Sequence, residues 1–174
     1  IDELHLKSVT DALTGAYTHG YLHEILELEI QHSLTHKTPL SMLILDIDDF
    51  KRINDNHGHL FGDRVIKETA ETINANIRSE DILGRYGGDE FVVIMPGAEH
   101  DTAHQAANRI CQAIAKNGYM VTVSIGATTF AGRDKQGVKD LIAAADANLY
   151  LAKREGKNQV ADRMPGEPSR LARS

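Results

Sequence analysis

The chain has 174 residues, and its 19 lysines and arginines against 25 aspartates and glutamates give a formal net charge of −6. This length is typical of one domain with a hydrophobic core of its own, and a single cysteine, Cys111, excludes a fold stapled by internal disulfides. The acidic balance, with 5% aromatic residues and no tryptophan, disfavours a groove that binds a nucleic acid polymer.

Composition divides the chain into a linker helix at residues 1–9, a folded domain at 10–161 and a flexible tail at 162–174. The first residue is Ile1 rather than Met and no signal peptide follows, so we expect the segment to come from a longer protein. Its apolar runs are far shorter than the roughly 18 residues of a membrane span, which predicts no membrane contact for this segment. The lone cysteine favours a cytoplasmic location, whether or not the full-length protein is attached to a membrane.

Hydrophobic periodicity predicts the helices and strands in chain order. Helices are expected at 21–37, 61–77, 102–116 and 138–154, and strands at 40–48, 82–86, 91–95, 120–130 and 159–161. The second and third strands flank Gly87-Gly88 and should form a hairpin. Because helices and strands alternate along the chain, we expect an α/β or α+β fold in which helices cover a sheet.

Two acidic clusters stand where predicted strands end. The strand at 40–48 runs into Asp46-Ile47-Asp48-Asp49, and Asp89 and Glu90 follow the two glycines of the hairpin. Side chains alternate along a strand, so Asp46 and Asp48 should share a face, and adjacent strands would bring both clusters together. Carboxylate oxygens are hard ligands that select Mg²⁺ or Mn²⁺.

A divalent ion at such a site is suited to phosphoryl or nucleotidyl transfer, because it binds substrate phosphates and stabilises the leaving oxygen. Either cluster alone is also compatible with a structural role, as a turn cap or as an ordinary hairpin turn. The occurrence of both clusters at strand ends favours the metal site.

The segment at residues 50–63 is dense in polar side chains. Lys51 is suited to a phosphate, and Asn54 and Asp63 are suited to the edge of guanine, which donates N1–H and an exocyclic amine. Lys153 and Lys157, one turn apart where the last helix ends, are suited to terminal phosphates. Each of these residues has a structural alternative as a helix cap, a solvated side chain or a partner of the helix dipole.

Several ordered motifs extend over residues 11–160. The hairpin carries Arg85-Tyr86-Gly87-Gly88-Asp89-Glu90-Phe91. The others are Asp11-Ala12-Leu13-Thr14-Gly15, the strand-end motif at 46–55, Gly58-His59 with Gly62-Asp63, and the closing helix at 144–158. Together they resemble the GGDEF domain, the diguanylate cyclase family of bacterial second-messenger signalling.

The resemblance implies an α+β fold, a central five-stranded sheet wrapped by helices and related to nucleotidyl cyclase and polymerase palm domains. It implies that Asp46, the Ile47 carbonyl, Asp89 and Glu90 hold Mg²⁺ or Mn²⁺. Asp89 and Glu90 are both candidates for the base that deprotonates the 3′-hydroxyl, and Lys51 would stabilise charge on the transferring phosphoryl group. The implied GTP-binding positions are Phe50, Lys51, Asn54, His59, Asp63, Gly87, Gly88, Lys153 and Lys157.

The implied function is a diguanylate cyclase that condenses two GTP into cyclic di-GMP and releases pyrophosphate. Each domain would hold one GTP, so the reaction requires a homodimer, and residues 1–9 would continue a linker from an upstream sensory domain. The alternative is a non-catalytic module that binds GTP or cyclic di-GMP as a regulatory receptor. Occupied catalytic positions favour the enzyme.

Arg78-Ser79-Glu80-Asp81 fits the family's RxxD motif for inhibition by the product. The intervening strand places this motif roughly 15 to 20 Å from the metal site, too far for a catalytic role. Arg78 and Asp81 would bind cyclic di-GMP, with Arg109 on the next helix as a candidate contact to a second domain. The alternative for Arg78 and Asp81 is a solvated ion pair.

Three positions depart from the family pattern. Thr18-His19 replaces the usual Asn-Arg pair, Lys157 replaces the commoner arginine and loses its bidentate fork, and Asp89 is the shorter of two permitted acids. Histidines also recur at i,i+4 spacing, but without the glutamate of a metalloprotease helix, so we expect solvated faces for 19/23, 32/36 and 100/104.

Overall fold

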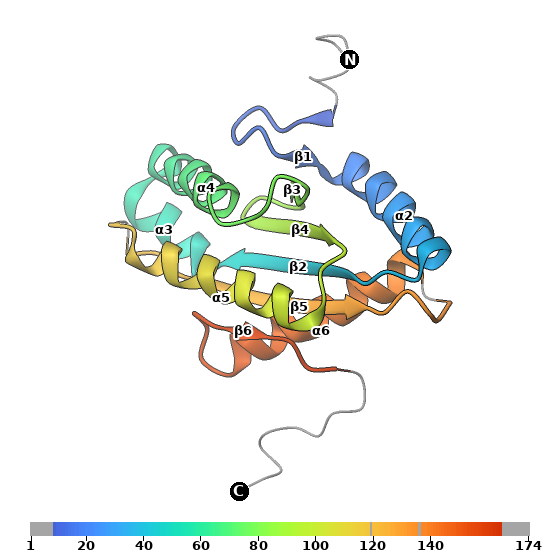
Figure 1. Ribbon diagram of the computed structural model, residues 1–174. Coiled ribbons are helices and arrows are strands. Elements are labelled where there is room, and N and C mark those ends of the chain that lie inside the picture. Colours follow the sequence, from blue (N-terminus) through green and yellow to red (C-terminus); the bar gives the residue numbers. More distant parts are fainter. Residues whose placement is uncertain (1–8, 119, 136, 165–174) are drawn as a thin grey trace, which may run out of the picture.

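The computed structural model describes residues 9–118, 120–135 and 137–164 (Figure 1). Residues 1–8 of the predicted linker helix and residues 165–174 of the predicted tail lie outside this range. The helices are α2 (His19–His36), α3 (Phe50–His57), α4 (His59–Asn74), α5 (His100–Lys116) and α6 (Val138–Arg154). The strands are β1 (Tyr17–Thr18), β2 (Leu40–Ile47), β3 (Ile82–Arg85), β4 (Glu90–Pro96), β5 (Val123–Phe130) and β6 (Val160–Ala161).

The strands form one mixed sheet in the order β1-β3-β4-β2-β5-β6. β2 lies between β4 and β5 and is antiparallel to both, while β1 and β6 pair in parallel with β3 and β5. The α+β class is confirmed, and each of the five predicted strands is present. The sheet has six strands instead of five because β1, a strand of two residues that was not predicted, adds an edge.

Helices cover both faces of the sheet (Figure 1). α4 and α5 bury Ile73 and Ile110 against one face, and α2 and α6 bury Leu26 and Leu149 against the other. Because β2 is covered on both sides, it is buried throughout Leu40–Leu45, as its continuous apolar run predicted. The acidic end of β2 therefore lies at the rim of the sheet, where this core stops.

α6 lies close against β5 because Gly126 has no side chain. A Cβ at this position would stand 2.2 Å from the carbonyl oxygen of Ala145 and 2.2 Å from the nitrogen of Leu149. The contact fixes the helix that carries Lys153 and leads into Lys157. Among the described residues, no helix is long and apolar enough to cross a membrane.

The polar segment at 50–63 folds into a helical elbow, so helix formation starts earlier than the predicted residue 61. α3 ends and α4 begins at Gly58, whose φ of 83° is a backbone conformation that glycine adopts without strain. α3 contains no buried residue. Its two apolar residues, Phe50 and Ile53, are partly buried against the core and are too few to establish a helical period.

The first residues assigned to the tail contact the domain. Asp162 Oδ2 lies 2.5 Å from His104 Nδ1 and 3.2 Å from His100 Nε2, and Arg163 Nη2 lies 2.6 Å from Glu155 Oε1. The 100/104 histidine pair is still partly exposed, at 37% and 43%, but both rings also contact a carboxylate close to the end of the described chain, which was not predicted. The ordered part of the domain extends past Ala161.

Candidate active site

The two acidic clusters meet where β2 ends and β4 begins. Asp46 pairs in register with Glu90, and the backbone N–H of Ile47 donates to the carbonyl oxygen of Asp89 at 3.1 Å. The contact arises because β4, the second strand of the hairpin, lies beside β2. The acidic residues at the start of β4 therefore lie next to those at the end of β2. Carboxylates 43 positions apart in the sequence thus share one end of the sheet.

Electrostatics indicate a crowded acidic site. Burial raises the pKa of Asp46 to about 6 even though Lys153 donates a hydrogen bond to it, and the Asp89 carboxyl within hydrogen-bonding reach adds to the rise. Burial also raises the pKa of Glu90, helped by the nearby charges of Asp46 and Asp146. Such a group of like charges is stabilised by a cation.

The donor set fits a divalent ion. Asp46 Oδ1 is buried and has no hydrogen-bond partner, although Oδ2 of the same carboxylate accepts from Lys153. Across the described ranges, no three or more His, Cys, Asp or Glu side chains converge as a ready metal cage. Mg²⁺ is typically held by one or two carboxylates and completed by substrate phosphates and water, and the unpartnered oxygen of Asp46 is a ligand of that kind.

Asp48 lies one residue past the end of β2. Its carboxylate accepts hydrogen bonds from the hydroxyls of Thr122 and Ser124, both at 2.6 Å, and from the backbone N–H of Asn158 at 3.0 Å. Ser124 also pairs in register with Asp46, so both carboxylates lie beside the same residue of β5. Asp48 is thus bonded within the protein, where it ties this end of β2 to β5 and to the loop after α6.

The signature turn is held by its own backbone and by Arg85. The N–H groups of Tyr86 and Gly87 both donate to the carbonyl oxygen of Glu90, at 2.8 and 3.2 Å. Arg85 donates to the carbonyl oxygen of Gly88 at 2.7 Å and forms an ion pair with Asp11 at 3.1 Å. These bonds fix the turn and leave Gly87 and Gly88 exposed.

Asp11 and Arg85 stand in two of the sequence motifs, but no role was predicted for either residue. Asp11 also accepts from the backbone and hydroxyl of Thr14, at 2.9 and 2.7 Å, which shapes the loop before β1. An acid and an arginine 74 positions apart leave no local signal. Asp146 on α6, whose charge raises the pKa of Glu90, was missed for the same reason.

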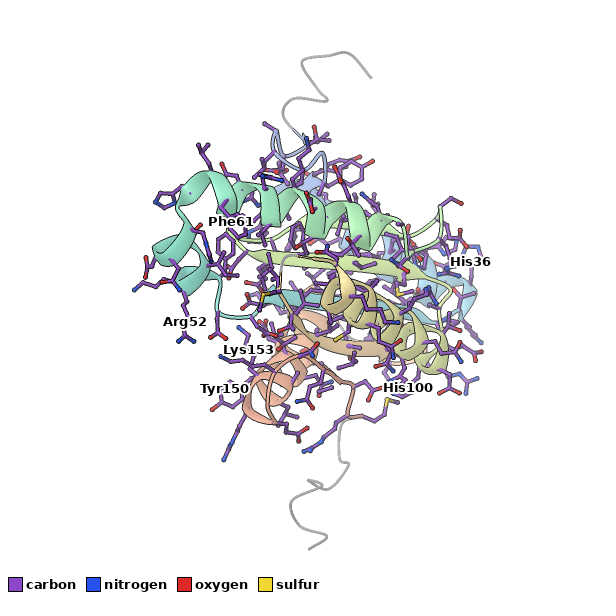
Figure 2. The ribbon with its side chains drawn as sticks, turned by 90° about the vertical axis from the view of Figure 1, so that its left-hand side faces the viewer. His36, Arg52, Phe61, His100, Tyr150 and Lys153 are labelled. Carbon is purple, nitrogen blue, oxygen red and sulfur yellow. The ribbon has the colours of Figure 1, made fainter. Side chains whose placement is uncertain are left out.

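The elbow of α3 and α4 carries the residues expected to bind the base. Asn54 lies on α3, with its side-chain Oδ1 buried and unpartnered, while His59 and Asp63 lie on α4 and are exposed. Lys51 is exposed on α3, and Phe50, half-buried, packs toward Gly62. Figure 2 shows α3, with Arg52 labelled, on the same side of the molecule as Lys153.

Both lysines at the end of α6 pair with the acidic end of β2. Lys153 Nζ contacts Asp46 Oδ2, and Lys157 Nζ lies 2.7 Å from Asp49 Oδ1. The two ammonium groups thus stand beside the carboxylates. A triphosphate bound at this end of the sheet would lie within reach of both groups.

The second predicted site lies at the opposite end of β3 from the signature turn. Arg78 Nη2 donates to Asp81 Oδ1 at 2.8 Å and to the carbonyl oxygen of Pro96 at 3.1 Å. The Asp81 side chain is completely buried, so the pair is not the solvated ion pair of the alternative interpretation. Arg109 reaches the same loop, where it donates to the carbonyl oxygen of Asn76 at 2.7 Å.

Comparison with protein families accounts for this geometry. Residues 8–159 match the family described as diguanylate cyclase, GGDEF domain. The chain belongs to the GGDEF domain family.

Curated relatives agree with this assignment. The GGDEF domain is 39% identical over 158 residues to diguanylate cyclase DosC of Escherichia coli K12, covering 86% of this chain and 34% of that protein. It is 37% identical over 162 residues to the response regulator PleD of Caulobacter vibrioides, covering 88% of this chain and 36% of PleD. The chain thus spans about a third of the length of these relatives.

Solved structures agree in fold. The GGDEF domain of DgcB from Caulobacter crescentus, determined in complex with c-di-GMP, has a TM-score of 0.82 and 27% identity, with 88% of this chain and 92% of that chain covered. Diguanylate cyclase SiaD from Pseudomonas aeruginosa, in complex with its activator SiaC, has a TM-score of 0.85 and 32% identity, covering 92% and 64%.

Proposed function

We propose that this GGDEF domain condenses two molecules of GTP into cyclic di-GMP with release of pyrophosphate. The observation that carries the proposal is the meeting of Asp46 and Asp89 at one end of the sheet, with a buried and unpartnered carboxylate oxygen on Asp46. Membership of the GGDEF family, with Asp46, Lys51, Asp89 and Glu90 all present, supports the same reaction.

Asp46, the Ile47 carbonyl, Asp89 and Glu90 are the proposed ligands of Mg²⁺, with Mn²⁺ as a substitute. When bound, the ion neutralises phosphate charge and favours attack by the 3′-hydroxyl. Asp89 and Glu90 are the two candidates for accepting the hydroxyl proton. The pH–rate profiles of Asp89→Asn and Glu90→Gln distinguish them, because loss of the base removes one limb of the profile.

The rest of the proposed site positions the nucleotide. Asn54 and Asp63 read guanine from the two sides of the elbow, with Phe50 and His59 beside the base and ribose. Lys51 stabilises charge on the transferring phosphoryl group, and the exposed backbone of Gly87 and Gly88 lets the phosphates approach closely. Lys153 and Lys157 bind the terminal phosphates once their acidic partners are displaced.

One domain supplies half of the reaction. Each 3′-oxygen forms a bond to the α-phosphorus of the other GTP, and each α–β phosphoanhydride bond breaks to release pyrophosphate. With one nucleotide per domain, two domains must face each other as a homodimer. An upstream sensory domain in the longer protein and a cytoplasmic location for this segment belong to the same proposal.

Inhibition by the product is proposed at Arg78, Asp81 and Arg109. The convergence of Arg78 and Arg109 on the Asn76–Asp81 loop supports a site for the phosphates and guanine of cyclic di-GMP. Arg78 is already bonded to Asp81, so a ligand would have to compete for these groups.

Incubation with GTP and Mg²⁺ at several protein concentrations, followed by chromatography, tests the function. We expect cyclic di-GMP and pyrophosphate in a 1:2 ratio, with specific activity rising with protein concentration. Bound GTP without product at any concentration would support the receptor alternative and contradict the enzyme.

A further inference from the structure

Gly62, near the start of α4, is buried and is the residue against which the Asn54 amide rests. A Cβ at position 62 would stand 1.8 Å from Asn54 Oδ1 and 2.9 Å from Asn54 Cγ. Both distances are far inside van der Waals contact. The amide of Asn54 therefore occupies the space that any other residue at position 62 would fill.

The same amide oxygen lacks a partner inside the protein. Asn54 Oδ1 is buried without a hydrogen bond, and a buried acceptor left unsatisfied is costly unless a donor reaches it from outside the chain. Guanine carries two such donors on one edge, N1–H and the 2-amino group. The position of this oxygen thus decides whether it meets them.

The backbone fixes the two residues across the elbow. Gly58 N–H donates to the carbonyl oxygen of Asn54 at 2.8 Å, and Gly62 N–H donates to the carbonyl oxygen of Gly58 at 3.1 Å. Asn54, Gly58 and Gly62 are therefore held in sequence through the bend, with Asp63 following directly. A substitution at position 62 should therefore move the side chain of Asn54 and leave its backbone in place.

We propose that Gly62 is a specificity-determining positioning residue, which keeps the Asn54 amide in the orientation that accepts a hydrogen bond from guanine. This inference rests on the proposed role of Asn54 in reading the base. The atom that a methyl group at 62 displaces first is the free end of a side chain, while Phe50 Cζ, at 3.3 Å, needs only a small adjustment. Alanine also favours the helix over glycine, so the substitution separates base reading from folding.

The test is the affinity of Gly62→Ala for non-hydrolysable analogues of GTP and of ATP, measured by calorimetry with Mg²⁺. The Kd for the GTP analogue should rise about tenfold, the size of one hydrogen bond near the upper end of the usual range. The Kd for the ATP analogue should stay unchanged, because adenine has neither of the two donors. An unchanged Kd for GTP, or an equal loss for both nucleotides, would overturn the proposal.

Gly20→Ala is the matched control. Gly20 is also a helical glycine, but a Cβ there meets nothing within 4 Å. This variant should bind both analogues as the parent does, and its thermal unfolding measured beside that of Gly62→Ala gives the effect of a helical methyl group alone.

A double-mutant cycle with Asn54→Ala separates this inference from the proposed function. Once the amide is gone, adding Gly62→Ala should leave the Kd of Asn54→Ala unchanged, even if Gly62→Ala alone folds poorly, because the methyl enters vacated space. A further loss in the double variant would contradict the role of Gly62. If Asn54→Ala binds the GTP analogue as tightly as the parent, Asn54 does not read the base and that part of the proposed function fails. If Asn54→Ala binds weakly but Gly62→Ala binds like the parent, only the inference about Gly62 is contradicted.

Discussion

Lys157 Nζ lies 2.7 Å from Asp49 Oδ1, so a lysine proposed to bind the terminal phosphate of GTP is paired with a carboxylate of its own chain. Hydrogen bonding to Asp49 raises the pKa of Lys157, and the same bond lowers the pKa of Asp49. Both side chains are about half-exposed, at 43% and 53%, so the pair is weak enough for a phosphate to displace it.

Asp49→Asn should therefore lower the KM for GTP by about two- to fivefold, because Lys157 no longer has a charged competitor. Asp55→Asn, on the exposed side of α3, removes the same charge and should leave the KM near the parent value. Steady-state kinetics of the three proteins measure the effect. A raised KM in Asp49→Asn would mean that the ion pair with Asp49 helps Lys157 to bind GTP and does not compete with the phosphate.

The raised pKa of Asp46 predicts how the stability of the metal-free protein depends on pH. The pKa of Asp46 in the folded protein is about 6, above the 3.8 that is usual for an aspartate. The favourable contribution of the protonated carboxyl to stability is therefore complete below about pH 4 and is lost as pH rises through 6. Asp46→Asn should consequently raise Tm in EDTA at pH 7.5 and change it little at pH 4.5. Mg²⁺ should raise the Tm of the parent at pH 7.5 and not that of the variant. Equal differences at both pH values would contradict the assigned burial and repulsion.

Arg78→Ala should relieve inhibition by cyclic di-GMP while the initial rate without product stays near that of the parent. The cost is a loss of about 2 kcal/mol in unfolding free energy, because the buried Asp81 carboxylate loses its charged partner. Inhibition curves and chemical denaturation measure the two effects. Arg133→Ala, an exposed change elsewhere, should match the parent in both. Parent-like inhibition in Arg78→Ala would refute the second site.

Arg109→Ala tests that site without disturbing the buried pair. Its bond to the Asn76 carbonyl is exposed, so stability should change by less than about 0.5 kcal/mol while the half-inhibitory concentration of cyclic di-GMP rises. The product titration decides between a binding role and a purely structural one. An unchanged half-inhibitory concentration would assign Arg109 to the Asn76 contact alone.

The contact of Asp162 with His100 and His104 predicts a second pH effect. Partial burial opposes protonation of His100, but hydrogen bonds to Asp162 and Asp101 and their charges outweigh it and raise the pKa of His100 above 6.5. Its stabilising contribution is therefore complete below about pH 6.5 and is lost as pH rises through the folded pKa. Asp162→Asn should lower Tm more at pH 6 than at pH 8.5. A larger decrease at pH 8.5 would reverse the sign and contradict the assignment.

The helices and strands could be predicted where their burial produces a hydrophobic pattern in the sequence. β2 is buried along most of its length and is apolar apart from Ser41 and Asp46, and α6 has the bounds that its apolar spacing predicted. β1 and α3 were not predicted in this way. β1 has two residues, and α3 has only two apolar residues, which are too few to establish a helical period.

The acidic site could be predicted in part for a similar reason. The sequence places Asp46 at the end of one strand and Asp89 just before another, and they meet because β2 and β4 are neighbours in the sheet. The hairpin turn predicts only that β3 pairs with β4. The hydrogen bonds of Asp48, the pairing of Lys157 with Asp49 and the packing of Asn54 on Gly62 depend on how loops and helices dock. Spacing along the chain does not contain that information.

The most direct test of the central claim is a titration with Mn²⁺ followed by electron paramagnetic resonance, with a non-hydrolysable GTP analogue present. The parent and a control, Asp101→Asn, should bind one or two ions per domain with the same affinity, whereas Asp46→Asn and Asp89→Asn should each bind at least about tenfold more weakly. Unchanged binding in both site variants would contradict the account, because positions 46 and 89 would then not share a cation.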